Sequence, residues 1–250
     1  MMTSGIDCAM PLTAKSAQAL AAHGYRFAAR YLVPAGYDWK RLTRAEAEAI
    51  TAAGMQIVSV FETAARRSAG GALAGHADGA LACREAHTVG QPAGSAIYFA
   101  VDYDAGPEQY DEIEAYLRAA AAEVPDYRIG VYGSYAVVEQ MAKRKVCSHF
   151  WQTHAWSRGR KSPFANIHQY KTNVSVDGIA MDLNQSFGQE GWWNTKAAAS
   201  DNRLDKADAD ALVRILQATW AAAKTQTDKD EIHRLANVVR RVSGQPEVKP

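Results

Sequence analysis

The chain has 250 residues, of which 48% are hydrophobic and 22% charged, and its formal net charge is +1. These values are ordinary for a soluble globular protein, and the length suits one barrel domain or two small domains. A net charge this small gives no general attraction to nucleic acid, which is therefore not an expected partner. No segment approaches the roughly 18 consecutive apolar residues that indicate a membrane span.

The cysteines and the first residues of the chain indicate the cellular compartment in which the protein is made. Cys8, Cys83 and Cys147 are odd in number, and their spacing matches no zinc motif. A disulfide framework is therefore not expected, which favours synthesis in the reducing cytoplasm. The opening "MMTSGIDCAM" lacks the charged and apolar regions of a standard secretory signal, so export of the protein would need a non-standard route.

Short apolar runs alternate with helical segments along the first 145 residues or so. Strands are predicted at 5–7, 27–32, 56–62, 97–101 and 128–133, with further strand-like runs at 149–156, 166–170 and 178–184. Helices are predicted at 13–24, 43–54, 71–88, 107–123 and 134–143. The spacing of Thr43 and Glu46 predicts a capping box at the second helix.

Eight strands alternating with helices predict a parallel sheet closed into a barrel. Because the last three strands have little helix between them, the expected fold is an irregular (β/α)8 TIM-like barrel with some helices missing. A doubly wound open sheet is the competing architecture. The first strand is not followed by a Gly-x-Gly-x-x-Gly turn, which disfavours a dinucleotide site, and no cofactor is expected.

A polar stretch separates the barrel, expected at residues 3–193, from the rest of the chain. Residues 194–207 are predicted to be a linker, 208–243 a two-helix extension and 244–250 a disordered tail. The second helix is expected to begin at a capping box formed by Asp228 and Glu231. Two amphipathic helices bury little by themselves, so they are expected to dock on the barrel, self-associate or bind a partner.

Acidic residues follow the predicted strands. Asp7 ends the first strand, Glu62 the third, Asp102 and Asp104 the fourth, and Asp182 lies near the end of the eighth. In a parallel barrel these ends meet at one mouth, where active sites lie. Asp102 and Asp104 are two residues apart, so on a strand they would share a face. Any one of the acids could instead cap a helix or a turn. The set of five favours a catalytic cluster.

Several carboxylates at one site suit glycoside hydrolysis, in which one group donates a proton and another acts as base, nucleophile or charge stabiliser. Two alternatives remain open: a barrel that binds glycan without cleaving it, and a metal-dependent phosphoesterase. His154 and His168 could join a metal site, but their spacing matches no metal-binding motif, and no bound metal is expected. Flat rings at or just beyond strand ends suit sugar binding; they are Tyr31, Tyr132, Trp151, Trp156 and Tyr170.

Three motifs, "GIDCAMPL", "AIYFAVDYDA" and "VDGIAMDLNQSF", resemble the bacterial glycoside-hydrolase-like domain of unknown function 1906 over about residues 3–193. That family is similar to the family 25 glycoside hydrolases, the lysozyme-type muramidases of bacteria and phages. The resemblance implies a modified barrel whose acidic groove cleaves the β-1,4 bond between N-acetylmuramic acid and N-acetylglucosamine in peptidoglycan.

The resemblance also implies roles for individual residues. Asp7 matches the aspartate of the opening motif, and Asp182 and Asn184 match the closing Asp-x-Asn. Asp102 matches the aspartate of an Asp-x-Glu motif, but Asp104 stands where the acid glutamate is expected. The proton donor is therefore expected to be Asp104 or Glu62, unless the site binds without cleaving.

The remaining predicted roles concern substrate binding. Arg30 is expected to pair with the acids of the site. Substrate contacts are expected from Arg30, Tyr31, Tyr132, Trp151, Gln169, Tyr170 and Asn184.

Overall fold

The structure is a computed structural model that describes residues 2–196, 206–243 and 245–248. The chain divides into two compact units, Met1–Ala198 and Ala199–Pro250. Each unit is described by itself.

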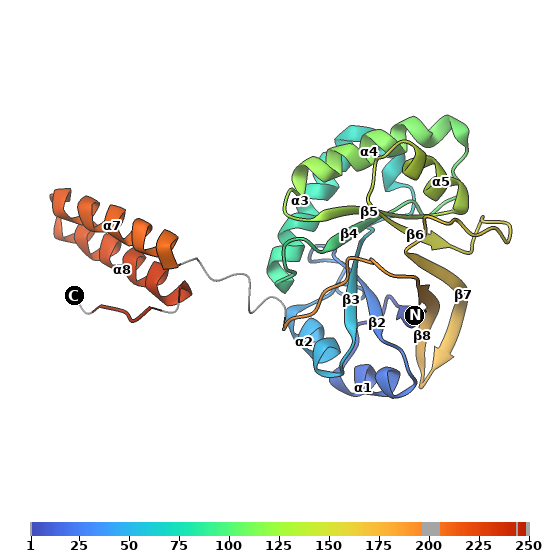
Figure 1. Cartoon of the computed structure of the whole chain (residues 1–250), viewed down its shortest axis with the longest axis horizontal. Helices are drawn as coiled ribbons and strands as arrows, with labels where there is room; N and C mark the ends of the chain where they lie inside the picture. Colours follow the sequence, from blue (N-terminus) through green and yellow to red (C-terminus); the bar gives the residue numbers. More distant parts are fainter. Residues whose placement is uncertain (1, 197–205, 244, 249–250) are drawn as a thin grey trace. The chain divides into compact units, whose positions relative to one another are not determined.

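The first unit is a closed eight-stranded barrel with the strands in sequence order around it (Figure 1). The strands are β1 (Thr3–Asp7), β2 (Phe27–Tyr31), β3 (Gln56–Phe61), β4 (Ala96–Ala100), β5 (Arg128–Gly133), β6 (His149–Thr153), β7 (Ile167–Val176) and β8 (Ile179–Ser186). Neighbours from β1 to β7 pair in parallel, whereas β8 runs antiparallel to both β7 and β1. The predicted barrel is confirmed, but the prediction of an all-parallel sheet is wrong for β8.

Helices cover the outside of the first five strands. They are α1 (Ala14–Ala22), α2 (Arg44–Ala52), α3 (Gly71–Val89), α4 (Tyr110–Glu123) and α5 (Tyr135–Lys143), with short 3-10 turns at Arg67–Gly70 and Pro107–Gln109. Residues 154–166, between β6 and β7, form turns and no helix. A tight turn at 177–178 joins β7 to β8, because an antiparallel neighbour needs no crossover helix.

Three helices begin where their cap residues predict. The side chains of Thr13, Thr43 and Ser134 each accept a hydrogen bond from a backbone N–H of the first turn. The capping box at Thr43 is only half formed. Thr43 Oγ1 accepts from the Glu46 N–H at 3.2 Å, but the Glu46 carboxylate turns inward to the buried Arg30. A buried guanidinium needs a carboxylate more than a solvated helix end does.

Strand alternation separates two packed regions. One cluster fills the barrel interior and comprises Phe27, Ala29, Val58, Val60, Ala96, Tyr98, Ala100, Trp151 and Ile167. The other lies between the sheet and the helices and includes Ile57, Ile97, Phe99 and Val131. Inward-facing positions follow every second residue. The interior row Val58–Val60 therefore leads to Glu62, and the row Tyr98–Ala100 leads to Asp102.

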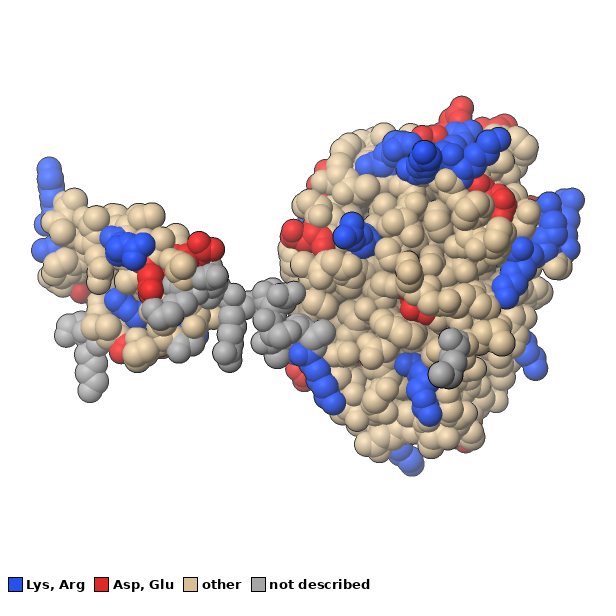
Figure 2. Space-filling view, viewed as in Figure 1, with Lys and Arg blue, Asp and Glu red and all other residues tan. Residues whose placement is uncertain are grey.

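On the face of the barrel unit drawn in Figure 2, basic side chains lie beside acidic ones. Figure 2 shows Lys and Arg gathered at its upper edge, where α4 and α5 lie, with acidic side chains among them. Arg144 lies 2.6 Å from Asp111 and 2.8 Å from Glu114 in this region.

The second unit is a pair of helices, α7 (Lys206–Ala222) and α8 (Gln226–Val242). Thr225, not Asp228, caps α8, because its Oγ1 accepts from the Asp228 N–H at 3.1 Å. In the predicted tail, the Val248 carbonyl accepts from Asn237 Nδ2 at 2.8 Å. Residues 197–205 of the predicted linker, and 244 and 249–250 of the tail, lie outside the described residues. None of the described helices is long and apolar enough to cross a membrane.

Candidate active site

A cavity of about 140 Å³ opens among the strands of the barrel. Its lining comprises Asp7, Tyr31, Val60, Glu62, Ala100, Asp102, Tyr132, Trp151, Gln169 and Asp182. Four carboxylates from β1, β8 and the residues just after β3 and β4 thus meet there, and we call it the acidic cavity. Asp104 is exposed and does not line it. The predicted shared face for Asp102 and Asp104 is wrong, because β4 ends at Ala100 and strand alternation does not continue to residue 104.

Asp182 reaches the cavity by a route different from the predicted one. It lies in the middle of β8, not at its end, and stands directly opposite Asp7 in the antiparallel β1–β8 ladder. Side chains directly opposite in such a ladder lie on the same face. The strand direction therefore brings a mid-strand residue into the cavity.

Asp7 lies at the buried side of the cavity and is 8% exposed. Its Oδ2 accepts hydrogen bonds from Gln169 Nε2 at 2.9 Å and from Asn184 Nδ2 at 2.6 Å. Burial raises the pKa of Asp7 to about 7, although these two hydrogen bonds oppose the rise. Asp7 is therefore a carboxyl that exchanges its proton near neutral pH.

Gln169 connects the two facing aspartates. Its Nε2 donates to Asp7 and, at 3.1 Å, to Asp182 Oδ2. Its Oε1 accepts from Tyr132 OH at 3.1 Å and Thr153 Oγ1 at 2.8 Å. Hydroxyl donors on one side and carboxylate acceptors on the other fix the orientation of the amide. Gln169 thus holds both carboxylates in place.

Glu62 and Asp102 differ in their electrostatic surroundings. Lys40 Nζ lies 3.6 Å from Glu62 Oε2, and both side chains are largely buried. Burial raises the pKa of Asp102, and the negative charge of Glu62 raises it further while Lys40 opposes the rise. Burial also raises the pKa of Asp182, and a 2.8 Å hydrogen bond from the Asn173 N–H counters this effect. The cavity therefore holds one carboxylate with a cation beside it and neighbours that favour protonation.

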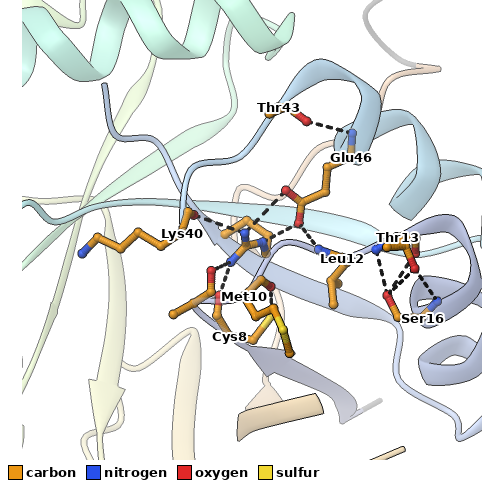
Figure 3. Close-up of polar contacts among 10 residues, drawn as sticks. Cys8, Met10, Leu12, Thr13, Ser16, Lys40, Thr43 and Glu46 are labelled. Atoms are coloured by element: carbon orange, nitrogen blue, oxygen red, sulfur yellow. Dashed lines mark hydrogen bonds and ion pairs between the residues drawn. The ribbon is translucent and has the colours of Figure 1, made fainter. Parts of the chain in front are cut away.

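Arg30 does not line the acidic cavity, so its predicted substrate contact is wrong. Its ion-pair partner is Glu46 and not one of the site acids, although its charge opposes the rise in the pKa of Asp7. Arg30 is 0% exposed, and its Nε donates to Glu46 at 2.6 Å. Its other donors bind the backbone oxygens of Cys8, Ala9 and Lys40 in the network of Figure 3. Alternation explains the error: Tyr31 on β2 faces the cavity, so its neighbour Arg30 must face the helices.

The other predicted substrate contacts divide into three groups. Tyr31, Tyr132, Trp151 and Gln169 line the cavity, whereas Tyr170 and Trp156 are exposed and do not. Asn184 is 0% exposed and acts behind the cavity wall, accepting from Trp151 Nε1 at 2.8 Å while donating to Asp7. Sequence reasoning missed Lys40, and only its place beside Trp39 and Tyr37 in an aromatic-rich loop could have marked it.

Histidine and metal chemistry receive no geometric support at this site. His154 is exposed, and His168 does not line the acidic cavity. No group of three or more His, Cys, Asp or Glu among the described residues is placed to hold a metal ion.

Comparison with known proteins places these observations in a family. The profile of the "Rv2525c-like, glycoside hydrolase-like domain" matches residues 18–186. The chain is 30% identical over 161 residues to "Putative peptidoglycan hydrolase Rv2525c" of Mycobacterium tuberculosis, covering 60% of this chain and 67% of that protein. It is 34% identical over 146 residues to the uncharacterized protein YbfG of Bacillus subtilis, covering 52% of this chain and 20% of that one.

Solved structures agree with the fold. A crystal structure of the Tat-secreted M. tuberculosis protein Rv2525c with L-tartrate superposes with a TM-score of 0.68 at 27% identity, covering 76% of this chain and 98% of that one. The catalytic domain of endolysin ply40 from a Listeria monocytogenes phage has a TM-score of 0.52 at 15% identity, covering 80% and 98%, and shows the fold alone. The profile match spans more than half of the chain, which therefore belongs to the Rv2525c-like family of glycoside-hydrolase-like domains.

Proposed function

We propose that the protein is a glycosidase that acts on bacterial cell-wall peptidoglycan and cleaves its β-1,4 bonds as a muramidase does. The observation that carries the proposal is the pairing, in one cavity, of Asp102 with a raised pKa and Glu62 beside a lysine. Glycoside hydrolysis needs a carboxyl that holds a proton and a second group that is ionised. The acidic cavity offers a carboxyl whose pKa is raised by burial and a second carboxyl with a lysine ammonium 3.6 Å away.

In this proposal Asp102 is the general acid and protonates the leaving oxygen. Glu62 is the carboxylate that activates water, attacks the sugar carbon or stabilises its positive charge. Asp7 and Asp182 hydrogen-bond the sugar, held in position by Gln169. Tyr31 and Trp151 contribute aromatic surface to the cavity lining, which suits a sugar. Asp104, which is exposed, has no role in the chemistry.

The substrate class draws its support from relatives. The family is defined by a glycoside-hydrolase-like domain, and the M. tuberculosis relative bears the name of a peptidoglycan hydrolase. That relative is Tat-secreted, which supports export of this protein to the cell wall.

The test is digestion of purified peptidoglycan followed by borohydride reduction and mass analysis of the products. We expect new reducing ends on muramic acid, no product from Asp102→Asn or Glu62→Gln, and full turnover by Asp104→Asn. Reducing ends on glucosamine would disprove the muramidase specificity. Undiminished turnover by Asp102→Asn would remove the proposed acid.

One observation favours a second candidate, a barrel that binds glycan without cleaving it. The acid glutamate that the family resemblance expects is replaced by Asp104, and this residue lies outside the cavity. Saturable binding to wall fragments without product after prolonged incubation would select this function.

We further propose that the chain consists of a barrel domain at 3–193 and a C-terminal extension at 208–243 that self-associates or binds a partner. Leu212, Ile215 and Trp220 of α7 are 42%, 62% and 45% exposed, which leaves apolar surface for such a contact. Light scattering of the full chain and of residues 1–196 would test this role.

A further inference from the structure

Lys40 is a buried cation in the loop between β2 and α2. It is 5% exposed, and its ammonium faces Glu62 at 3.6 Å. Three rings surround the same ammonium, since Nζ lies 4.5 Å from the ring centre of Tyr31, 5.2 Å from Trp39 and 6.0 Å from Tyr37. Cation–π contacts replace part of the lost hydration. A buried charge is costly unless paired, and Glu62 is the pairing carboxylate.

Two hydrogen bonds hold the backbone of Lys40 in place. Its carbonyl accepts from Arg30 Nη2 at 3.2 Å, and its N–H donates to the Tyr37 carbonyl at 2.9 Å. The same guanidinium binds the carbonyls of Cys8 and Ala9, directly after Asp7. One buried side chain therefore joins the segment that follows Asp7 to the segment that carries Lys40. In Figure 3 the Lys40 side chain extends away from this network.

The carboxyls around Lys40 differ in how directly they interact with its ammonium. Glu62 after β3 is its ion-pair partner, and Asp102 after β4 feels both Glu62 and Lys40. Tyr31 on β2 contributes its ring, and burial raises the pKa of its phenol, which therefore stays neutral. Asp7 on β1 and Asp182 on β8 complete the charge of the cavity. Without the cation, the negative charge of Glu62 would still raise the pKa of Asp102, but no positive charge would set the two carboxyls apart.

We propose that Lys40 is the positioning residue that divides the roles of the two carboxyls. Its ammonium is the ion-pair partner of Glu62, which leaves Asp102 as the carboxyl assigned to proton donation. Arg30 acts one step further away by fixing the backbone of Lys40. The inference rests on the proposed glycosidase function, and it names the residue that makes two similar acids unequal.

The first experiment compares pH–rate profiles of wild type, Lys40→Met and Lys40→Arg, with the exposed Lys143→Met as the matched control. Loss of the cation makes both carboxyls harder to ionise, and the paired Glu62 more so than Asp102, so the acidic limb of the bell is expected to move up by about one pH unit in Lys40→Met and the alkaline limb by less. Lys40→Arg is expected to restore the position, and Lys143→Met to leave it unchanged. Structural damage alone lowers the height of the bell without moving it. A Lys40→Met bell that is lower but unmoved overturns the inference.

The second experiment needs no turnover and follows the Asp102 carboxyl by carbon-13 NMR through a pH titration. Its midpoint is expected to rise in Lys40→Met and to fall in Glu62→Gln, where the repelling charge is removed. Glu62→Gln keeps the test available should Lys40→Met fail to fold. Unmoved midpoints overturn the inference even when peptidoglycan is cleaved. Midpoints that move as expected, with no cleavage by the wild type, overturn the glycosidase function and leave the role of Lys40 standing.

Discussion

Replacing Asp7 with asparagine tests the electrostatics of the cavity through stability rather than activity. Asparagine has the shape of a protonated aspartate, and its oxygen can accept from both Gln169 and Asn184 as Asp7 Oδ2 does. The substitution therefore removes a buried titratable group while keeping its two hydrogen bonds. Any pH-dependent difference between the two proteins then reports the protonation of Asp7.

The sign and size follow from the pKa. Burial raises the pKa of Asp7 from 3.8 to about 7, so folding favours the protonated form. The stability that Asp7 contributes is full below about pH 4 and is lost as the pH rises towards 7. The difference between 3.8 and about 7 corresponds to roughly 4 kcal/mol at about 1.36 kcal/mol per pH unit. For a barrel of this size it amounts to a change in Tm on the order of 10 °C.

The assay is thermal unfolding of wild type and Asp7→Asn between pH 4 and pH 8. We expect the two to differ little at pH 4 and the variant to be more stable at pH 8, with the gap opening between these values. Asp104→Asn, exposed and outside the cavity, is the control and should show no such gap. A variant that is less stable than wild type at pH 8, or a gap independent of pH, would refute the reasoning.

Three further predictions concern the network, the amide and the ion requirement. Glu46→Gln breaks the buried ion pair with Arg30 and should lower the free energy of unfolding, measured by chemical denaturation, by about 3–5 kcal/mol. The control Glu48→Gln breaks an exposed pair with Arg44 and should lower it by less than about 1 kcal/mol. Equal losses in the two variants would contradict the argument from burial. Gln169→Leu removes one of the two donors to Asp7, so the NMR titration midpoint of Asp7 should move above about 7, and a downward move would show that Gln169 does not stabilise the carboxylate. Peptidoglycan cleavage should persist in chelator, and loss of cleavage with recovery on adding Mg²⁺ would contradict a mechanism carried by carboxyls alone.

Much of the fold could be predicted from local sequence, because the pattern that indicates each strand or helix lies within a short segment of the chain. Thr13, Thr43 and Ser134 cap helices where their side chains predict. Hydrophobic alternation along a strand fixes which residues share a face. The sequence alone therefore predicts that Glu62 and Asp102 continue the interior faces of β3 and β4. Closure of the barrel then brings the ends of these strands to one cavity. The same rule, applied to β2, would have placed Arg30 outside the barrel.

The tertiary structure alone decided features that depend on partners far along the chain. The direction of β8 is set by its pairing with β1 and β7, and this direction is what places Asp182 opposite Asp7. The end of β4 at Ala100 removes Asp104 from the shared face that its spacing predicts. Lys40 lies buried beside Glu62, and its carbonyl accepts a hydrogen bond from Arg30, which lies ten residues away and on the other side of the sheet. Residue spacing along a chain cannot encode these long-range pairings, and here they determine which charged side chains meet at the cavity.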